Sequence, residues 1–281
     1  MGQKAPGEKR MKRDRLEYVW YAVRPLLYYL ILFITIREVL ARLLETVLLR
    51  RAYDMAYYSA YLEGTAQTVI VGIATAGALV PVLREGRREI MILGARSDSA
   101  WIAKRRDSRR LMAMLPLGTI CLCALLNLLL AAGTDPGTQS LPAVGIPAGL
   151  PLSAAVYGIL TPFAEELVYR GIVYHRMRRI CRPMAAAFFS SLLFGAAHAD
   201  LRQGVYAFIM GMVFALSLEL TRRFEVPFLL HSTCNLAVLA ASFAGWGQVL
   251  AAPMWILFFA VTATAVFVYW GVRALRTGFQ F

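Results

Sequence analysis

The sequence predicts an all-α membrane protein of about eight transmembrane helices packed in one bundle. Of its 281 residues, 59% are hydrophobic and only 17% are charged, whereas a soluble domain is about 45–50% apolar and about 25% charged. Residues 111–132, 226–250 and 251–272 contain no Asp, Glu, Lys or Arg. A bilayer core needs roughly 20 apolar residues per spanning helix. A soluble globular enzyme, a disordered chain and a disulfide-rich secreted domain are therefore excluded.

Eight apolar stretches are long enough to be spans. We expect them at roughly 19–38, 65–83, 111–132, 148–172, 184–200, 204–221, 226–244 and 248–272. The stretch 39–60 mixes leucines with charges at helical spacing, which predicts an interfacial amphipathic helix continuing the first span. No repeat or Gly/Ser-rich linker divides the chain, so we expect one bundle. It comprises a basic tail (1–18), an amino-terminal transmembrane region with a basic loop (19–110) and a transmembrane core (111–281).

The distribution of Lys and Arg predicts the topology. The amino-terminal tail is basic, as are the loop 84–110, the segment 170–182, Arg222–Arg223 and the tail with Arg273 and Arg276. The loop 133–147 and the turn 245–247 contain neither Lys nor Arg. With eight spans, the basic segments fall on one side, which the positive-inside rule makes the cytoplasm. We therefore expect an integral multi-pass protein with both termini cytoplasmic; only Arg50 and Arg51 break the pattern.

The net charge of +13 is better explained by these loops than by a nucleic-acid partner. A positive cytoplasmic face favours anionic lipid headgroups. The four cysteines form no CxxC pair, and three of them lie in apolar runs, where Cys acts as a small hydrophobe. They predict neither a disulfide framework nor a structural zinc site.

Ionisable groups within spans are costly and usually functional. The sequence Glu165-Glu166-Leu167-Val168-Tyr169-Arg170 follows Thr161-Pro162, where either a new helix begins or a continuous helix kinks. Glu166 and Arg170 are four residues apart and can pair on one face. Glu165 points about 100° away and remains free to act as a general base. The alternative is a structural ion-pair cluster at a span end.

Two of the three histidines fall in the apolar carboxyl-terminal region. His198 ends Phe194-Gly195-Ala196-Ala197-His198, whose small residues would let another backbone approach closely. His231 and Asn235 are four apart and share a helix face, where they could stabilise an oxyanion or form an interhelical hydrogen-bond clamp. His175, among arginines, is expected at the cytoplasmic surface.

One glutamate, two histidines and an asparagine on separate helices can activate water and stabilise a tetrahedral intermediate, which is the chemistry of amide hydrolysis. Glu165, His198 and His231 could instead be zinc ligands. We expect no cofactor, because Asn235 is a better oxyanion donor than zinc ligand. The sequence contains no HExxH, GxSxG or P-loop motif.

The ordered motifs EExxxR, FxxxH and HxxxN, within 148–240, resemble the CPBP family of CAAX proteases and bacteriocin-processing enzymes, also called type II CAAX prenyl endopeptidase-like proteins. The resemblance implies an eight-span intramembrane protease or a related protein. It implies Glu165 as general base, His198 in water binding, and His231 with Asn235 as the oxyanion site. Glu166 and Arg170 would support this geometry.

The leading hypothesis is therefore an intramembrane endopeptidase acting on a peptide or lipidated protein. One alternative is a non-catalytic relative that binds a peptide through the same polar cluster. A proton-coupled transporter would also use buried carboxylates and histidines, but the chain shows no pair of broken, repeated halves. To bring His198 level with Glu165, we expect the Glu165 helix to continue to about Arg179. The turn Ala199–Gly204 would then line a water-filled cavity.

Overall fold

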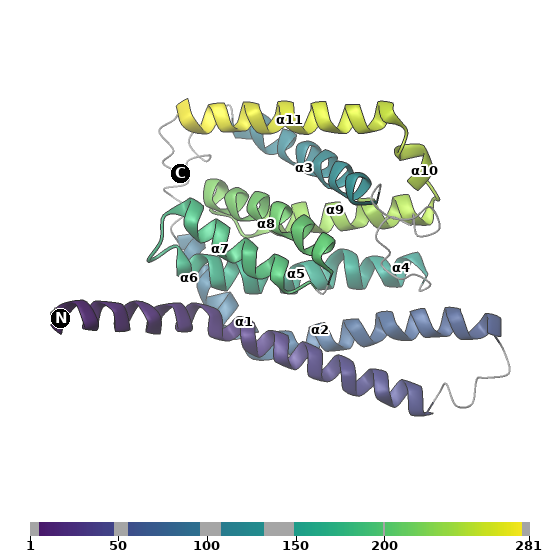
Figure 1. Ribbon diagram of the computed structural model, residues 1–281, viewed down its shortest axis with the longest axis horizontal. Helices are drawn as coiled ribbons and strands as arrows, with labels where there is room; N and C mark the ends of the chain where they lie inside the picture. The colour runs from purple at the N-terminus through teal and green to yellow at the C-terminus, as the bar shows by residue number, and fades with distance from the viewer. Residues whose placement is uncertain (1–5, 48–55, 96–107, 132–148, 199, 277–281) are drawn as a thin grey trace, which may run out of the picture.

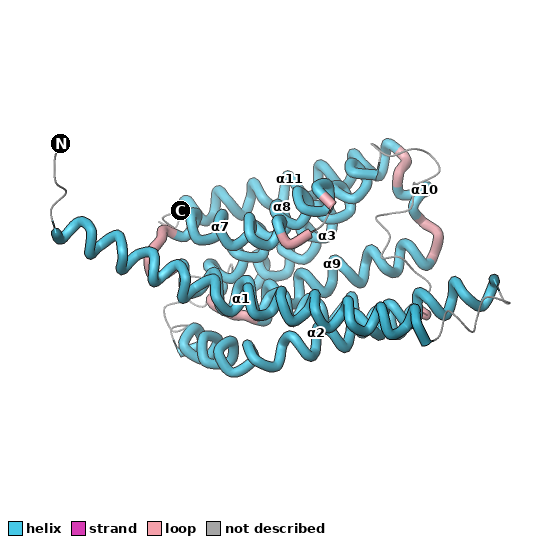
Figure 2. The backbone as a smooth tube through the Cα atoms, turned by 60° about the horizontal axis from the view of Figure 1, so that its bottom comes forward, coloured by secondary structure: helices cyan, strands magenta, loops and turns pink. Residues whose placement is uncertain are grey.

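A computed structural model describes residues 6–47, 56–95, 108–131, 149–198 and 200–276. These residues are almost entirely helical, as Figure 2 shows, and no strand occurs among them. The predicted all-α membrane fold is confirmed.

The long helices follow the predicted spans closely. They are α1 (Pro6–Val47), α2 (Ala56–Ala95), α3 (Ser108–Ala131), α7 (Pro183–Ala196), α8 (Leu201–Thr221), α9 (Glu225–Phe243) and α11 (Pro253–Arg276), with a short α10 (Gly247–Leu250) before the last. Between α3 and α7 lies one compound helix, 150–177. Its successive parts are α4 (Leu150–Ser153), η4 (Ala154–Leu160), α5 (Thr161–Glu166), η5 (Leu167–Tyr174) and α6 (His175–Met177), where η marks π-helical turns.

Within the described ranges, six helices are long and apolar enough to cross a membrane: α1, α2, α3, α8, α9 and α11. The other two predicted spans correspond to the compound helix and to α7. The first is interrupted by π-helical turns, and the second has only 14 residues. The protein is thus a multi-pass membrane protein, and the predicted number of eight is approximate.

The compound helix lies at the centre of the bundle. In Figure 1, α1 and α2 pack together along one side and α3 and α11 along the opposite side, with α7, α8 and α9 between. The compound helix contacts α1, α2, α7 and α9. All eight residues of η5 are buried. A helix enclosed on every side is well placed to hold costly polar groups away from lipid.

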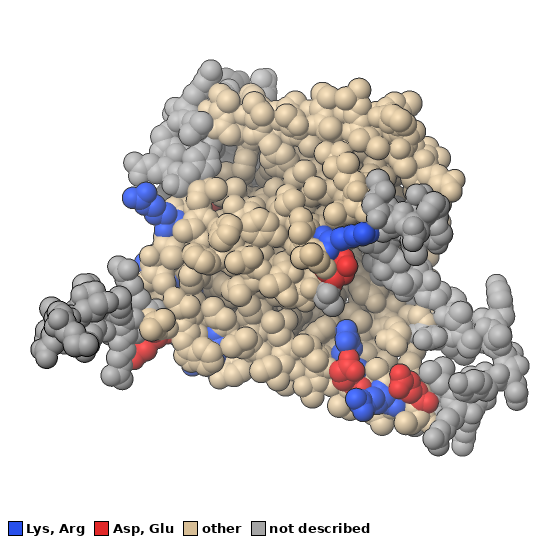
Figure 3. Space-filling view, in the orientation of Figure 1, with Lys and Arg blue, Asp and Glu red and all other residues tan. Residues whose placement is uncertain are grey.

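The outer helices are apolar where they face outward. Large hydrophobic side chains on α11, such as Leu257 and Val261, are 65% and 58% exposed. Figure 3 shows a broad uncharged area on this face between described charged residues toward its two ends. The beginning of α1 and the end of α11 lie at the same end of the bundle (Figure 1). Which side of the membrane that end faces stays a prediction.

Two expectations at this end were wrong. The loop predicted to begin at 84 is helical as far as Ala95 in α2, because Glu85 and Glu89 find cationic partners on the compound helix. His175, predicted at the surface, is 5% exposed, with Nδ1 3.0 Å from Glu89 Oε2. Arginines next in sequence to His175 do not make it exposed, since the helix continues to Met177 against α2.

Other expectations are met in part. The amphipathic stretch 39–60 continues α1 as far as Val47 and begins α2 at Ala56, while 48–55 and the loop residues 133–147 lie outside the described residues. The turn expected at 199–204 is shorter. α8 already begins at Leu201, because the Asp200 side chain accepts a hydrogen bond from the Gln203 backbone N–H and caps the helix.

Candidate active site

Glu166 is the most enclosed carboxylate of the candidate site. Its side chain has no exposed surface, and Oε1 accepts hydrogen bonds from Arg170 Nη1 at 2.8 Å and from His231 Nδ1 at 2.9 Å. The predicted Glu166–Arg170 pair is therefore present, one turn apart within the compound helix. The bond to His231 also ties this helix to α9.

The Arg170 guanidinium lies in an aromatic enclosure. Its Cζ lies 4.6 Å from the ring centroid of Phe194 and 5.4 Å from that of Phe214. Gly211 provides the space, because a Cβ there would lie 2.9 Å from Arg170 Nη2. Cation–π contact and the carboxylate together stabilise a charge that would otherwise be too costly to bury.

His231 is held in one orientation. A carboxylate only accepts, so Nδ1 carries the hydrogen donated to Glu166. The ring stacks on Phe214, with centroids 4.9 Å apart and planes inclined by 20°. Its other nitrogen, Nε2, lies 3.7 Å from Glu165 Oε2, which is too long for a direct hydrogen bond.

His198 is held in the same way. Its Nδ1 lies 2.9 Å from the Phe194 carbonyl oxygen, so Nδ1 donates, and Nε2 of the neutral ring carries a lone pair. The Phe194 ring makes edge contacts with both imidazoles, at 5.2 Å from His198 and 5.9 Å from His231. Glu165 lies within electrostatic range of both histidines. The structure thus brings the acid and the two imidazoles together.

The approach of α7 to α8 depends on the small residues before His198. A Cβ on Gly195 would lie 2.6 Å from the Gly204 carbonyl oxygen, so the two backbones touch there. This is the close approach that the sequence predicted.

Asn235 lies one turn after His231 on α9, and its Nδ2 donates to the Tyr157 carbonyl oxygen at 2.9 Å. In η4, Thr161 N–H bonds back five residues to Val156. The next donor in that register would be residue 162, which is a proline and has no N–H. Asn235 therefore supplies the hydrogen bond that Pro162 cannot. This is the interhelical clamp that the sequence left open.

The backbone at Thr161-Pro162 distinguishes between a new helix that begins there and a continuous helix. Leu160 and Thr161 both have right-handed helical backbone angles, and no side chain caps the helix there. The helix continues through Pro162, so the prediction of a continuous helix holds and that of a new helix does not.

Sequence reasoning missed the aromatic part of the site. Phe214 lies within an apolar run of α8, where nothing distinguishes it from a core residue. Tyr29 on α1 and Tyr169 on η5 are buried and within electrostatic range of Glu165. Tyr29 belongs to a span without any motif, so only the packing of α1 against η5 reveals it.

Among the residues that the structure describes, no group of three His, Cys, Asp or Glu side chains is arranged to hold a metal ion. Glu165, His198 and His231, the alternative zinc ligands, form no such group, and no chemical step below depends on a metal.

This fold and site define a class: a polytopic helical membrane protein with a carboxylate–imidazole centre inside the bundle. Residues 147–237 match the family model "Type II CAAX prenyl endopeptidase Rce1-like". The range includes all six candidate residues, namely Glu165, Glu166, Arg170, His198, His231 and Asn235. This part of the chain is therefore similar to Rce1-like endopeptidases, and the resemblance predicted from the three motifs is confirmed.

Two curated relatives are similar over parts of their length. The putative membrane peptidase YdiL of Bacillus subtilis is 33% identical over 86 residues, which cover 31% of this chain and 35% of the relative. The membrane-embedded CAAX protease MroQ of Staphylococcus aureus is 30% identical over 107 residues, covering 36% and 42%. The chain thus spans about two fifths or less of the curated relatives it matches. No solved structure matches it significantly.

Proposed function

We propose that the protein is a membrane-embedded endopeptidase that hydrolyses a peptide bond of a membrane-associated or lipidated protein. The observation that carries the proposal is the difference between two adjacent carboxylates. Glu166 is fully enclosed and bonded to Arg170 and His231. Glu165 has a side chain 22% exposed and faces two imidazoles without a direct hydrogen bond to either.

The spacing of these groups fits a water molecule as nucleophile. A water oxygen can hydrogen-bond to Glu165 and to a second group when the two are between about 3 and 5 Å apart, and Glu165 Oε2 is 3.7 Å from His231 Nε2. The lone pair on His198 Nε2 can accept the other water hydrogen. Glu165 takes a proton as the water oxygen bonds to the carbonyl carbon of the substrate.

The resulting oxyanion needs hydrogen-bond donors. Protonated His231 has two N–H groups, and Glu166 binds only the one on Nδ1, so Nε2–H can donate to the oxyanion. The amide of Asn235 has two hydrogens, of which the Tyr157 carbonyl takes one. The C–N bond then breaks, and Glu165 returns its proton to the leaving nitrogen. Glu166 and Arg170 position His231.

Substitution of Glu165 tests the proposal. We expect Glu165→Gln to reduce peptide hydrolysis by roughly 10²–10⁴-fold, because the base is lost. The matched control is Glu225→Gln at an exposed position at the start of α9, which should leave the rate unchanged. Both variants should elute and melt like the wild type. Turnover retained in Glu165→Gln would refute the mechanism, and peptide binding by the wild type without product would favour the non-catalytic alternative.

Metal dependence is tested separately. We propose that hydrolysis needs no metal, and we expect a chelator to leave the rate unchanged and purified protein to contain less than one equivalent of zinc. Stoichiometric zinc that is lost together with activity would overturn the metal-free route, while leaving the assignment as a protease intact.

A further inference from the structure

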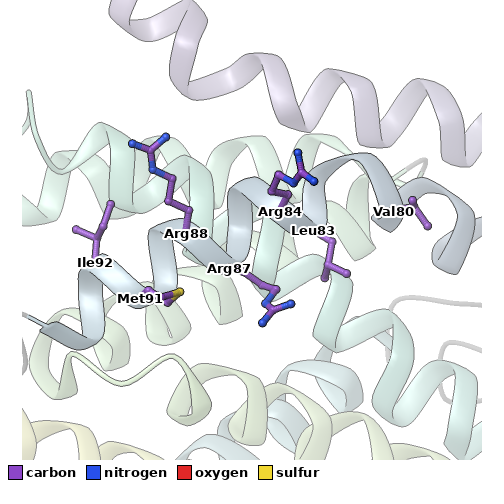
Figure 4. A pocket seen from close by; sticks show the side chains of 7 residues that line it. All are labelled: Val80, Leu83, Arg84, Arg87, Arg88, Met91 and Ile92. Carbon is purple, nitrogen blue, oxygen red and sulfur yellow. The ribbon is translucent and has the colours of Figure 1, made fainter.

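One cluster of charges plays no part in the proposed chemistry. Arg84, Arg87 and Arg88 are exposed on the last turns of α2. They line a hollow of about 600 Å³ together with Val80, Leu83, Met91 and Ile92. Figure 4 shows Arg84 and Arg88 projecting from one edge of the helix and Arg87 from the other. Along the helix the guanidinium groups stand between two apolar pairs, Val80 with Leu83 and Met91 with Ile92.

These arginines remain unneutralised because the nearby carboxylates, Glu85 and Glu89, pair with other cations. On the same turns, Glu85 bonds to Arg176 at 2.7 Å, and Glu89 bonds to Arg176 at 3.0 Å and to Arg179. Within the described ranges, no carboxylate lies at ion-pair distance from Arg84, Arg87 or Arg88. One face of α2 is thus fully paired, and the other presents three free positive charges.

The apolar side chains in the hollow indicate which anion belongs there. Val80 and Met91 are each 71% exposed, which is unfavourable against water alone. The apolar run of α2 is the predicted span 65–83, which is close to the roughly 20 residues that a bilayer core requires. Arg84 is the first charged residue after that span. The hollow therefore lies where acyl chains give way to headgroups.

We propose that this hollow is a binding site for an anionic phospholipid. The guanidinium groups bind the phosphodiester, a geometry that favours arginine. The first part of the acyl chain lies along Val80 and Leu83, on the membrane side of the arginines. The site is separate from the candidate active site, and the proposal depends only on the membrane location of the protein.

The test uses the full chain in nanodiscs with spin-labelled phosphatidylglycerol or phosphatidylcholine as the probe. We expect the wild type to prefer phosphatidylglycerol by about tenfold or more. This preference comes from direct contact between the phosphodiester and the guanidinium groups, two of which belong to Arg84 and Arg88. Arg84→Gln with Arg88→Gln should therefore remove most of this preference. Because both side chains are exposed, the variant should fold normally.

The matched control is Arg182→Gln with Arg223→Gln, which removes the same charge from exposed positions near the ends of α7 and α8. It should change the preference by less than about twofold. An equal loss of the phosphatidylglycerol preference in both double variants would mean that general surface charge causes it, and would overturn the proposed site. Binding of inorganic phosphate alone, as tightly as the lipid, would also overturn it, since the apolar part would then contribute nothing.

Discussion

Carboxylates near the carboxyl end of the compound helix have several cationic partners, whereas Glu165 in its middle has no Lys or Arg partner among the residues described. At the carboxyl end, Glu89 of α2 is bound by His175, Arg176 and Arg179. Close by, Glu219 of α8 accepts from the Tyr174 hydroxyl at 2.6 Å and pairs with Arg178 and Arg222.

In the middle of the helix, no Lys or Arg of the described chain lies at ion-pair distance from Glu165, and its nearest potential cation is His231. This difference separates structural carboxylates from a carboxylate that can react. A carboxylate that only holds helices together is neutralised by several donors. Glu165 has none of them and is left with partners that can exchange protons.

The largest effect is expected at the fully buried Glu166–Arg170 pair. Here too, as at the carboxyl end of the helix, a buried carboxylate is neutralised by a cation. Arg170→Met leaves Glu166 without its cation, and we expect a loss of about 3–5 kcal/mol in the free energy of unfolding. Thermal or denaturant unfolding in detergent measures it. The control is Arg223→Met, whose partner Glu225 is exposed and whose removal should cost about 0–1 kcal/mol. Equal losses would show that burial of the Glu166–Arg170 pair is unimportant.

Asn235→Ala separates the clamp from the chemistry. As a clamp to Tyr157 it contributes about 1 kcal/mol to stability. As an oxyanion donor it contributes roughly 10²–10³-fold to the rate. We expect both losses, with the rate measured per folded molecule so that the two are separated. A stability loss with an unchanged rate would reduce Asn235 to a structural role.

Glu89→Gln tests the carboxylates near the carboxyl end of the compound helix, which are expected to be structural. The loss of a carboxylate that pairs with Arg176 and Arg179 should lower the free energy of unfolding by about 1–3 kcal/mol. The rate of hydrolysis per folded molecule should not change, since Glu89 of α2 contacts the carboxyl end of the compound helix and not Glu165. A large fall in this rate would contradict the division into structural and reactive carboxylates.

An effect on stability similar to that of Glu89→Gln is expected when the space beside Arg170 is filled. Gly211→Ala places a Cβ 2.9 Å from Nη2 and 3.1 Å from Ser191 Cβ, and we expect a loss of about 1–3 kcal/mol. Gly271→Ala is the control, because its Cβ would meet nothing within 4 Å. There, the better helix propensity of Ala should raise stability by up to about 1 kcal/mol. Unfolding midpoints that rank the other way would contradict the tight fit around Arg170.

The spacing of residues in the sequence predicted the neighbours within one helix. Contacts between helices depend on packing and could not be predicted in this way. Four-residue spacing was enough for Glu166–Arg170 and for placing His231 beside Asn235, since a helix fixes those neighbours. The role of Asn235 toward Tyr157 could not be predicted, because it depends on π-helical turns around Pro162. His175 and the end of α2 were misjudged for a related reason. Charges that look like a solvated loop become a buried network when their partners lie about 90 residues away.

The π-helical turns on both sides of Glu165 and Glu166 couple the length of this helix to the direction of its side chains. Each such turn holds one residue more than an α-helical turn, and one residue corresponds to about 100° of rotation. A single-codon deletion within 154–160 would let η4 relax to the ordinary pitch. That relaxation takes up most of the rotation that the missing residue would cause, whereas a deletion within α5 (Thr161–Glu166) would swing one side by about 100° relative to the other. A change of length should therefore be tolerated within η4 more readily than between the two π-helical stretches, where it would turn Glu165 away from the histidines.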